Sequence, residues 1–186
     1  MNPRPRLLVL ALLSSFGSSC VADSRAQVAG TGAGAVDIVD ASPLEGGLGS
    51  LDEVARAVVE GLNTNKAQSL RQLLLSEADF TGRLFDVLSN HPNARQMGPG
   101  LIFAMQGRQS EDDLARALER FGGRGLRLLA VEPGVIETAK GATLYRRPLL
   151  RVEDARGEPL ALELLGTVIE HTPSHTFKLL GYRLRE

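Results

Sequence analysis

The chain has 186 residues, 43% of them hydrophobic and 23% charged, which suits one globular domain with short appendages. A formal net charge of -1 argues against a surface built to neutralise nucleic-acid phosphates, and an aromatic content of 4% without Trp disfavours stacking sites for sugars or bases. The single cysteine excludes an intramolecular disulfide.

The start of the chain has the organisation of an export signal. Arg4 and Arg6 precede the apolar run 7–13, and mostly small residues follow as far as residue 19. The apolar run is much shorter than the roughly 20 residues that a membrane-spanning helix needs. We therefore predict that residues 1–19 are a signal peptide, which is removed on export.

Cys20 ends the sequence Phe16-Gly17-Ser18-Ser19-Cys20, which resembles a bacterial lipobox. The resemblance implies that Cys20 carries a diacylglyceryl thioether and that the signal is cut just before it, as in palmitate-bearing lipoproteins. Gly17 departs from the pattern, because an aliphatic residue is usual there. The alternative is ordinary signal-peptidase cleavage after Ala22.

An acylated Cys20 would hold the protein permanently to a membrane, since each buried methylene contributes about 0.8 kcal/mol. Val21 and Ala22 follow the cysteine, and no Asp stands where inner-membrane retention would place one. We expect an exported lipoprotein of the cell outer membrane that faces the periplasm, with the inner membrane as the alternative.

The segment after the cysteine is predicted to be a tether. Residues 20–49 are rich in Ala, Gly, Ser and Asp without a helical or strand period, so they favour a flexible coil with a span of roughly 30 Å. Residues 30–35 match a dinucleotide-binding glycine pattern, but the flanking strand and helix that such a site needs are not indicated. Residues 50–186 are predicted to form a single domain.

Helices are expected in the first half of this domain. Ser50 and Glu53 form a capping box before an apolar face that runs over residues 51–62. A second helix is predicted at 66–75, and Ser76 is placed to cap a third.

Two further helices are predicted before residue 124. Pro99 suits the first turn of a short one, and Ser110 with Asp113 can cap another, which Gly122-Gly123 ends. The acids 111–113 look like a ligand cluster, but acids in a first turn are what the helix dipole favours.

The second half of the domain has strand character. Four strands are expected, at 126–132, 143–153, 159–171 and 176–185, and Pro133-Gly134 is predicted to break the chain after the first. Gly166 and Gly181 indicate bulges or bends. The prediction is therefore an α+β fold, with N-terminal helices packed on a curved antiparallel sheet of about four strands.

This order of elements resembles the nuclear transport factor 2-like superfamily, whose domains also occur in ketosteroid isomerases and polyketide cyclases. The resemblance is carried by segments 50–75 and 164–170 and by the helix end Arg120-Phe121-Gly122-Gly123. It implies a cystatin/nuclear transport factor 2-like cone. Some members use the pocket between helices and sheet for small apolar ligands, and others use it only for packing or dimerisation.

Enzymes of this kind need a carboxylate base that faces an oxyanion donor such as Tyr. The strands offer Tyr145, Tyr182, Glu163 and His171, but none matches a catalytic motif residue by residue. We therefore predict no catalytic residue. A small pocket enzyme of the isomerase or cyclase kind is the alternative function.

Metal binding is not predicted either. His171 and His175 lie four residues apart across an expected hairpin, but a catalytic zinc usually needs a third protein ligand. His91 belongs to a distant turn. No metal and no cofactor is expected.

The long strand 159–171 carries the prediction about partners. Alternation directs Leu162 and its even-numbered neighbours toward the helices, but Leu165 and Ile169 leave the second face partly apolar. We expect that face to be covered by a second copy, by part of the tether or by an envelope partner. The predicted function is a non-catalytic ligand- or protein-binding domain tethered to the membrane.

Overall fold

The computed structural model describes residues 40–88 and 96–185. The predicted signal peptide 1–19, Cys20 and most of the tether lie outside the described residues, as does the turn that contains His91. In the described part of the chain, no helix combines the length and the apolar character that crossing a membrane requires.

The first helix confirms the predicted capping box. α1 is Leu51–Asn63, and the Ser50 hydroxyl accepts a hydrogen bond from the Glu53 backbone N–H at 3.1 Å. The Glu53 carboxylate reaches one residue further back than expected and accepts from the Gly49 N–H at 2.7 Å. The predicted apolar face is the buried face.

The second helix is shorter than predicted. α2 is Ala67–Arg71, and the residues after it leave the helix to bond with the last strand: the Leu75 N–H donates to the Leu179 carbonyl at 2.8 Å. The predicted cap is present at Ser76, whose hydroxyl accepts from the Asp79 N–H at 3.2 Å. Three short elements follow it: α3 (Glu77–Asp79), the π-helix η1 (Phe80–Leu84) and α4 (Phe85–Leu88).

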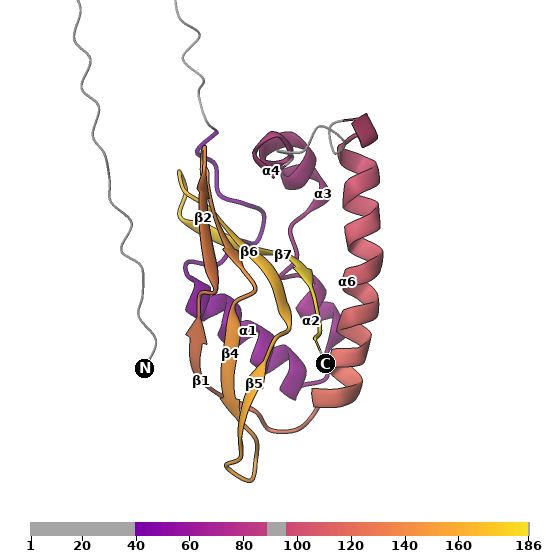
Figure 1. Ribbon diagram of the computed structural model, residues 1–186, viewed down its shortest axis with the longest axis vertical. Coiled ribbons are helices and arrows are strands. Elements are labelled where there is room, and N and C mark those ends of the chain that lie inside the picture. The colour runs from indigo at the N-terminus through magenta and orange to yellow at the C-terminus, as the bar shows by residue number, and fades with distance from the viewer. Residues whose placement is uncertain (1–39, 89–95, 186) are drawn as a thin grey trace, which may run out of the picture. The chain divides into compact units, whose positions relative to one another are not determined.

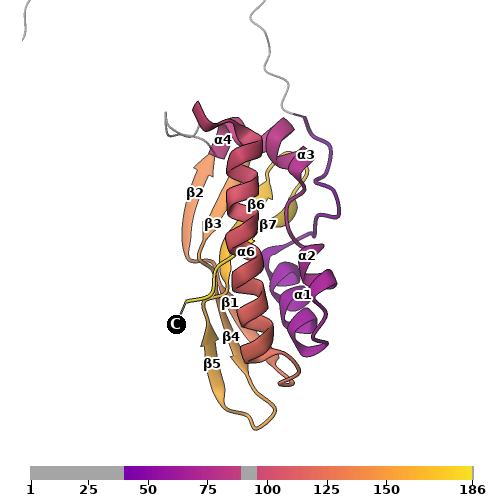
Figure 2. The same cartoon turned by 90° about the vertical axis from the view of Figure 1, so that its right-hand side faces the viewer.

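One long helix replaces the two that were predicted before residue 124. α6 is Pro99–Phe121 and runs without a break along both sheets (Figure 2). The prediction that Ser110 caps a new helix is wrong. Its hydroxyl instead accepts from the Tyr182 backbone N–H at 2.9 Å, so the side chain joins α6 to the sheet.

The second half of the domain forms seven strands in two antiparallel sheets, so the α+β class is confirmed and the number of four strands is wrong. The strands are β1 (Arg127–Glu132), β2 (Val135–Ala139), β3 (Ala142–Arg146), β4 (Leu149–Glu153), β5 (Pro159–Leu162), β6 (Leu165–His171) and β7 (Thr176–Tyr182). Their order is β1-β4-β5 in one sheet and β2-β3-β6-β7 in the other, and the second lies above the first in Figures 1 and 2.

The two sheets derive from one meander, in which three successive chain segments are each interrupted between a strand of one sheet and a strand of the other. β1 continues into β2, β3 into β4 and β5 into β6 after only two residues each time. At the first break Gly134 has a φ of +70°, and a Cβ there would lie 2.2 Å from the Arg146 carbonyl oxygen. At the second break Arg147 also has a positive φ. The expected irregularity at Gly166 is confirmed, because the β6–β7 register shifts around it.

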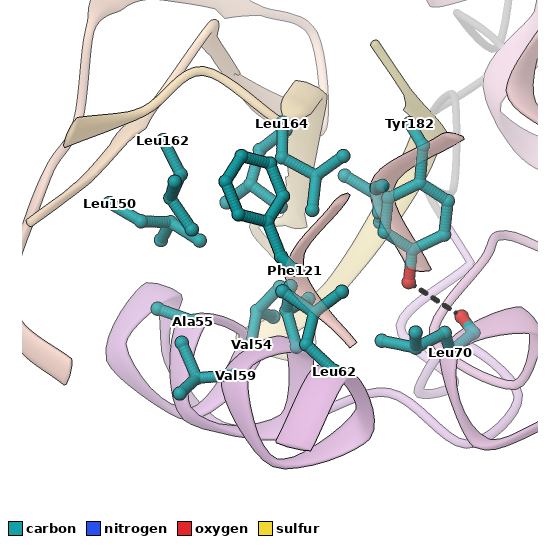
Figure 3. Close-up of a cluster of buried hydrophobic side chains, with 14 of the residues drawn as sticks. Val54, Ala55, Val59, Leu62, Leu70, Phe121, Leu150, Leu162, Leu164 and Tyr182 are labelled. Carbon is teal, nitrogen blue, oxygen red and sulfur yellow. Dashed lines mark hydrogen bonds between the residues drawn. The ribbon is translucent and has the colours of Figure 1, made fainter. Parts of the chain in front are cut away.

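The main core lies between α1, the end of α6 and the sheets (Figure 3). A second buried cluster, which contains Leu44 and Phe80, covers the opposite face of β6 at Ile169. Leu165 and Ile169 are only 2% and 0% exposed. Both faces of this strand are therefore covered by the chain itself. Leu165 belongs to the main core, and Leu44 of the predicted tether is part of the cover at Ile169, which is one of the three covers that the sequence predicted.

Residues 40–49, which we call the strap, pack against the domain although the sequence assigned them to the tether. Leu44 is buried, and Leu48 exchanges two backbone hydrogen bonds with Phe177 of β7. The described part of the folded unit thus begins at least ten residues before Ser50.

Candidate functional site

The two tyrosines proposed for the site are engaged in separate places. The Tyr182 hydroxyl donates to the Leu70 carbonyl at 2.7 Å inside the core, and burial raises the pKa of this phenol (Figure 3). The Tyr145 hydroxyl donates to the Glu170 carboxylate at 2.9 Å, and partial burial raises its pKa as well. Both hydroxyls already donate to an acceptor within the chain, whereas an oxyanion donor must be available to a substrate.

The remaining candidates do not gather around one point. Glu163 is exposed, with its carboxylate 3.9 Å from the Arg185 guanidinium. His171 is buried with its Nδ1 2.7 Å from the Ser174 hydroxyl, and burial lowers the pKa of its imidazole. His175 is exposed and contacts Glu170. Across residues 40–88 and 96–185, no three His, Cys, Asp or Glu side chains are grouped as metal ligands.

The acids 111–113 lie in the middle of α6, so the explanation by the helix dipole is wrong. Glu111 forms a bidentate ion pair with Arg71, with nitrogen–oxygen distances of 2.9 and 2.7 Å. Asp113 is buried and pairs with Arg116 one turn along the same helix. Glu111 thus connects α6 to α2, and Asp113 fixes the side chain of Arg116 on the same helix.

The described residues line an open cavity of about 440 Å³ between α6 and the sheets. The resemblance implied a pocket between helices and sheet, but the sequence did not predict its arginines. Its lining is formed by Gln106, Gln109, Ser110, Arg146, Arg147, Gly166, Thr167, Leu180, Gly181, Tyr182, Arg183 and Arg185. A volume of this size is within the range of roughly 300–1,000 Å³ that small-molecule sites occupy.

The line of strand breaks provides the space for this cavity. Gly166 lies at the bulge between β6 and β7, and a Cβ there would lie 2.7 Å from the Gly181 carbonyl oxygen. The bond from the Tyr182 N–H to Ser110 fixes α6 beside the same stretch of β7. The cavity therefore lies between α6 and the irregular part of the β6–β7 pair.

Four of the twelve lining residues are arginines, and two of them have carboxylate partners. Arg146 pairs with Glu137 of the neighbouring strand at 2.7 Å, and its side chain is 45% exposed. Arg185 has the longer contact of 3.9 Å to Glu163 and is 50% exposed. Exposed pairs of this kind are weak, so both guanidiniums can exchange partners at little cost.

The positive charges of the other two arginines, Arg147 and Arg183, are not compensated by a carboxylate of the described residues. Within the described residues, the guanidiniums of Arg147 and Arg183 have no hydrogen bond, ion pair or ring contact. Their backbones are held nonetheless: the Arg147 N–H donates to the Gly166 carbonyl and the Arg183 N–H to the Leu164 carbonyl, both at 2.8 Å. Arg147 has a φ of +54°, a conformation that ordinary residues rarely adopt outside functional or strained sites.

The chemistry of this lining is that of an anion site. Guanidinium groups donate in a planar fork that matches carboxylate and phosphate oxygens, and they stay charged at any physiological pH. The amides of Gln106 and Gln109 and the hydroxyl of Thr167 add neutral donors. Of the described residues that line the cavity, none carries a carboxylate, an imidazole or a thiol.

A second cavity, of about 590 Å³, lies beside the strap and Lys178. Lys178 is 4% exposed, its Nζ donates to the Gln72 carbonyl at 2.7 Å, and burial lowers the pKa of its ammonium. Gly46 of the strap covers this amine closely, because a Cβ there would lie 3.3 Å from the Nζ atom. The amine of Lys178 is already engaged by the Gln72 carbonyl and covered by the strap, so it is not available to a ligand. The arginine-lined cavity is therefore the better candidate site.

Comparison of the chain with protein-family models, with curated proteins and with solved structures gives no match.

Proposed function

We propose that the domain binds an anionic ligand in the arginine-lined cavity and works as a non-catalytic binding domain at a bacterial membrane. The observation that carries the proposal is the pair Arg147 and Arg183: both residues line a cavity of ligand size, and their guanidiniums have no partner in the described residues. The carboxylates of Glu137 and Glu163 compensate the other two arginines, so two uncompensated positive charges remain, and a bound anion relieves the repulsion between them.

Binding is favoured over catalysis by the roles of the lining groups. Tyr182 lines the cavity, but its hydroxyl is used by the Leu70 carbonyl. The alternative, an isomerase-like pocket enzyme, is supported by the hydrogen bond between Tyr145 and Glu170. Neither of these two residues lines either cavity, and the carboxylate is bonded to the phenol instead of facing it across a space.

The membrane attachment rests on the sequence pattern around Cys20. We expect that Cys20→Ala abolishes labelling by fatty acid and releases the protein from the membrane fraction. A wild-type protein that takes up no label and is found in the soluble fraction would favour cleavage after Ala22. Separation of the two membranes would then test the proposed position in the outer membrane, facing the periplasm.

A relationship to the nuclear transport factor 2-like superfamily is also a proposal. Helices that pack on an interrupted antiparallel meander support it, while seven strands in two sheets exceed the number that the cone requires. A second copy or an envelope partner likewise stays a proposal, and its surface must be another than the face of Leu165 and Ile169, which the chain buries.

Calorimetric titration with inorganic phosphate tests the anion site. We expect Arg147→Ala combined with Arg183→Ala to weaken binding at least about tenfold, which corresponds to about 1.4 kcal/mol. Arg56→Ala is the matched control, because Arg56 is an exposed arginine of α1 away from the cavity. Binding should also weaken as salt increases. Phosphate binding that is absent, or equal in the double variant and the control, would refute the proposal.

A further inference from the structure

The two arginines without partners lie on opposite sides of one stretch of chain at the start of β6. Arg147 follows β3 and Arg183 follows β7, and these strands pair with the two sides of β6. The Arg147 N–H donates to the Gly166 carbonyl, and the Arg183 N–H donates to the Leu164 carbonyl. Adjacent strands are about 4.8 Å apart, so the two arginine backbones are roughly 10 Å apart. Each guanidinium ends a flexible stem, so both can contact one phosphate group.

Gly166 leaves space beside these arginines. A Cβ at this position would lie 3.5 Å from the Cβ of Arg183 and 2.7 Å from the Gly181 carbonyl oxygen. Any larger side chain here would therefore crowd an arginine of the cavity wall. The residue between the two uncompensated arginines is thus one that takes up no room in the cavity.

The charge of the lining matches a dianion. Two of the four arginines are paired with carboxylates, so two positive charges remain uncompensated within the described residues. A phosphate monoester carries nearly two negative charges at neutral pH, since its second pKa is about 6. A phosphate diester or a sulfate ester carries only one, so it would leave one positive charge of the lining uncompensated.

The neutral part of the lining is polar. Gln106, Gln109 and Ser110 come from one side of α6, and Thr167 comes from β6. Within residues 40–88 and 96–185, the exposed amide side chains of Gln106 and Gln109 have no hydrogen bond. Amides both donate and accept, and so do the hydroxyl groups of a sugar. This part of the cavity therefore suits a hydroxylated body.

We propose that the anion is a phosphate monoester of a polyhydroxylated molecule, that is, a sugar phosphate. Its phosphate group binds Arg147 and Arg183, and its hydroxyl groups bind Gln106, Gln109 and Thr167. A phosphate group alone has the volume of a few water molecules of roughly 30 Å³ each, so a cavity of about 440 Å³ also has room for the sugar. This inference rests on the proposed anion site and names the class of ligand that the site takes.

Two other kinds of phosphate ester fit this lining less well. The aromatic residue of the lining, Tyr182, is 3% exposed, so its ring is not available to stack on a nucleobase. Of the strongly exposed large apolar side chains of the described residues, none lines the cavity, so an acyl chain would gain little there.

The first experiment compares four probes by calorimetry with the folded protein at about pH 7.5, where phosphate monoesters are dianions. The probes are glucose 6-phosphate, methyl phosphate, methyl sulfate and glucose. We expect methyl phosphate to bind at least about tenfold more tightly than methyl sulfate, which has the same shape and one charge fewer. Glucose 6-phosphate should bind at least about fivefold more tightly than methyl phosphate, the effect of about one net hydrogen bond. Glucose alone should not bind measurably.

Variants then separate the two parts of the site. Gln106→Ala combined with Gln109→Ala should remove the preference for glucose 6-phosphate over methyl phosphate. Gln68→Ala is the matched control, because Gln68 is exposed on α2 and lines neither cavity. Arg147→Ala combined with Arg183→Ala should weaken both phosphates and remove their preference over methyl sulfate.

The outcomes distinguish this inference from the proposed function. If methyl sulfate binds as tightly as methyl phosphate, or glucose 6-phosphate no more tightly than methyl phosphate, the sugar phosphate is refuted, while binding that depends on the arginines keeps the anion site. If none of the anions binds, the anion site fails and the inference fails with it. If glucose binds as tightly as glucose 6-phosphate and the arginine variants change nothing, both are wrong.

Discussion

Leu48 and Phe177 exchange both of their backbone hydrogen bonds, from Leu48 N to Phe177 O at 3.0 Å and from Phe177 N to Leu48 O at 2.7 Å. Phe177 belongs to β7, one of the two edge strands of its sheet, and an uncovered edge is open to pairing with other chains. The strap thus protects this edge while it buries Leu44 beside Ile169. The strap is therefore part of the folded domain, although its amino-acid composition is typical of a linker.

The strap should therefore contribute to stability. We predict that Leu44→Ala lowers the free energy of unfolding by about 2–4 kcal/mol, because it leaves a cavity at a side chain that is 2% exposed. Urea denaturation would measure the change. Leu129→Ala, the same substitution at an exposed site, should have little effect, and equal losses in the two variants would show that the strap does not pack as described.

Tyr182 offers a way to separate a buried hydrogen bond from ring packing. We predict that Tyr182→Phe costs about 1 kcal/mol, because it removes the hydroxyl bonded to Leu70 and keeps the ring. Tyr182→Ala should cost about 3–5 kcal/mol, since the ring itself is lost from the core. The comparison uses urea denaturation, and a Phe variant as stable as the wild type would contradict the hydrogen bond.

The first strand break needs a residue without a side chain. We predict that Gly134→Ala lowers stability by roughly 2–5 kcal/mol, because the new Cβ would meet the Arg146 carbonyl and φ is positive. Gly157→Ala is the control: its φ is +82°, but open space surrounds it. It should cost only about 1–2 kcal/mol. Thermal unfolding of both variants tests whether crowding adds to backbone strain.

Local sequence signals predicted those parts of the fold that local interactions determine. Ser50 and Ser76 were recognised as caps because their partners lie three residues away. Ser110 is followed by an acid at the same spacing but does not cap a helix. Its hydroxyl instead accepts a hydrogen bond from the backbone N–H of Tyr182, which is distant in the sequence. The strand break at Pro133-Gly134 was predicted, because proline and glycine interrupt strands. The break at Arg147 was missed, because the segment 143–153 was predicted to be one continuous strand.

The candidate site could not be predicted for a similar reason. Arg146 and Arg147 lie inside the predicted strand 143–153, while Arg183 and Arg185 lie at the end of the predicted strand 176–185, and nothing in either segment indicates that they meet. Their proximity depends on strand order, which brings β3 and β7 to the two sides of β6. The bends predicted at Gly166 and Gly181 were the available signal, since both glycines line the cavity.

The burial of both faces of β6 changes the expected result of one substitution. We now predict that Leu165→Lys destabilises the monomer as severely as Leu162→Lys, by at least about 3 kcal/mol, because each places an unpaired charge in the core. Ile136→Lys, at a side chain that is 54% exposed, should change stability by less than about 0.5 kcal/mol. Selective loss of self-association in Leu165→Lys, with stability intact, would restore the earlier interpretation.

Acid should weaken the fold through His171. Burial lowers the pKa of its imidazole, the Arg83 charge lowers it further, and Asp40 and Asp79 partly oppose both effects. In the unfolded chain a histidine has a pKa of about 6.5. Below that pH the imidazole is protonated in the unfolded state but still neutral in the folded state. Protonation therefore stabilises the unfolded state, and the free energy of unfolding falls as the pH drops from about 6.5 toward the folded pKa.

The measurement is the free energy of unfolding by urea across this pH range, with His171→Gln beside the wild type. Whatever the absolute stability of the variant, the part of the pH dependence that His171 contributes should disappear. His175→Gln is the control, because the His175 side chain is 76% exposed and only contacts Glu170. If His171→Gln keeps the full pH dependence of the wild type, protonation of this buried imidazole does not limit stability in acid.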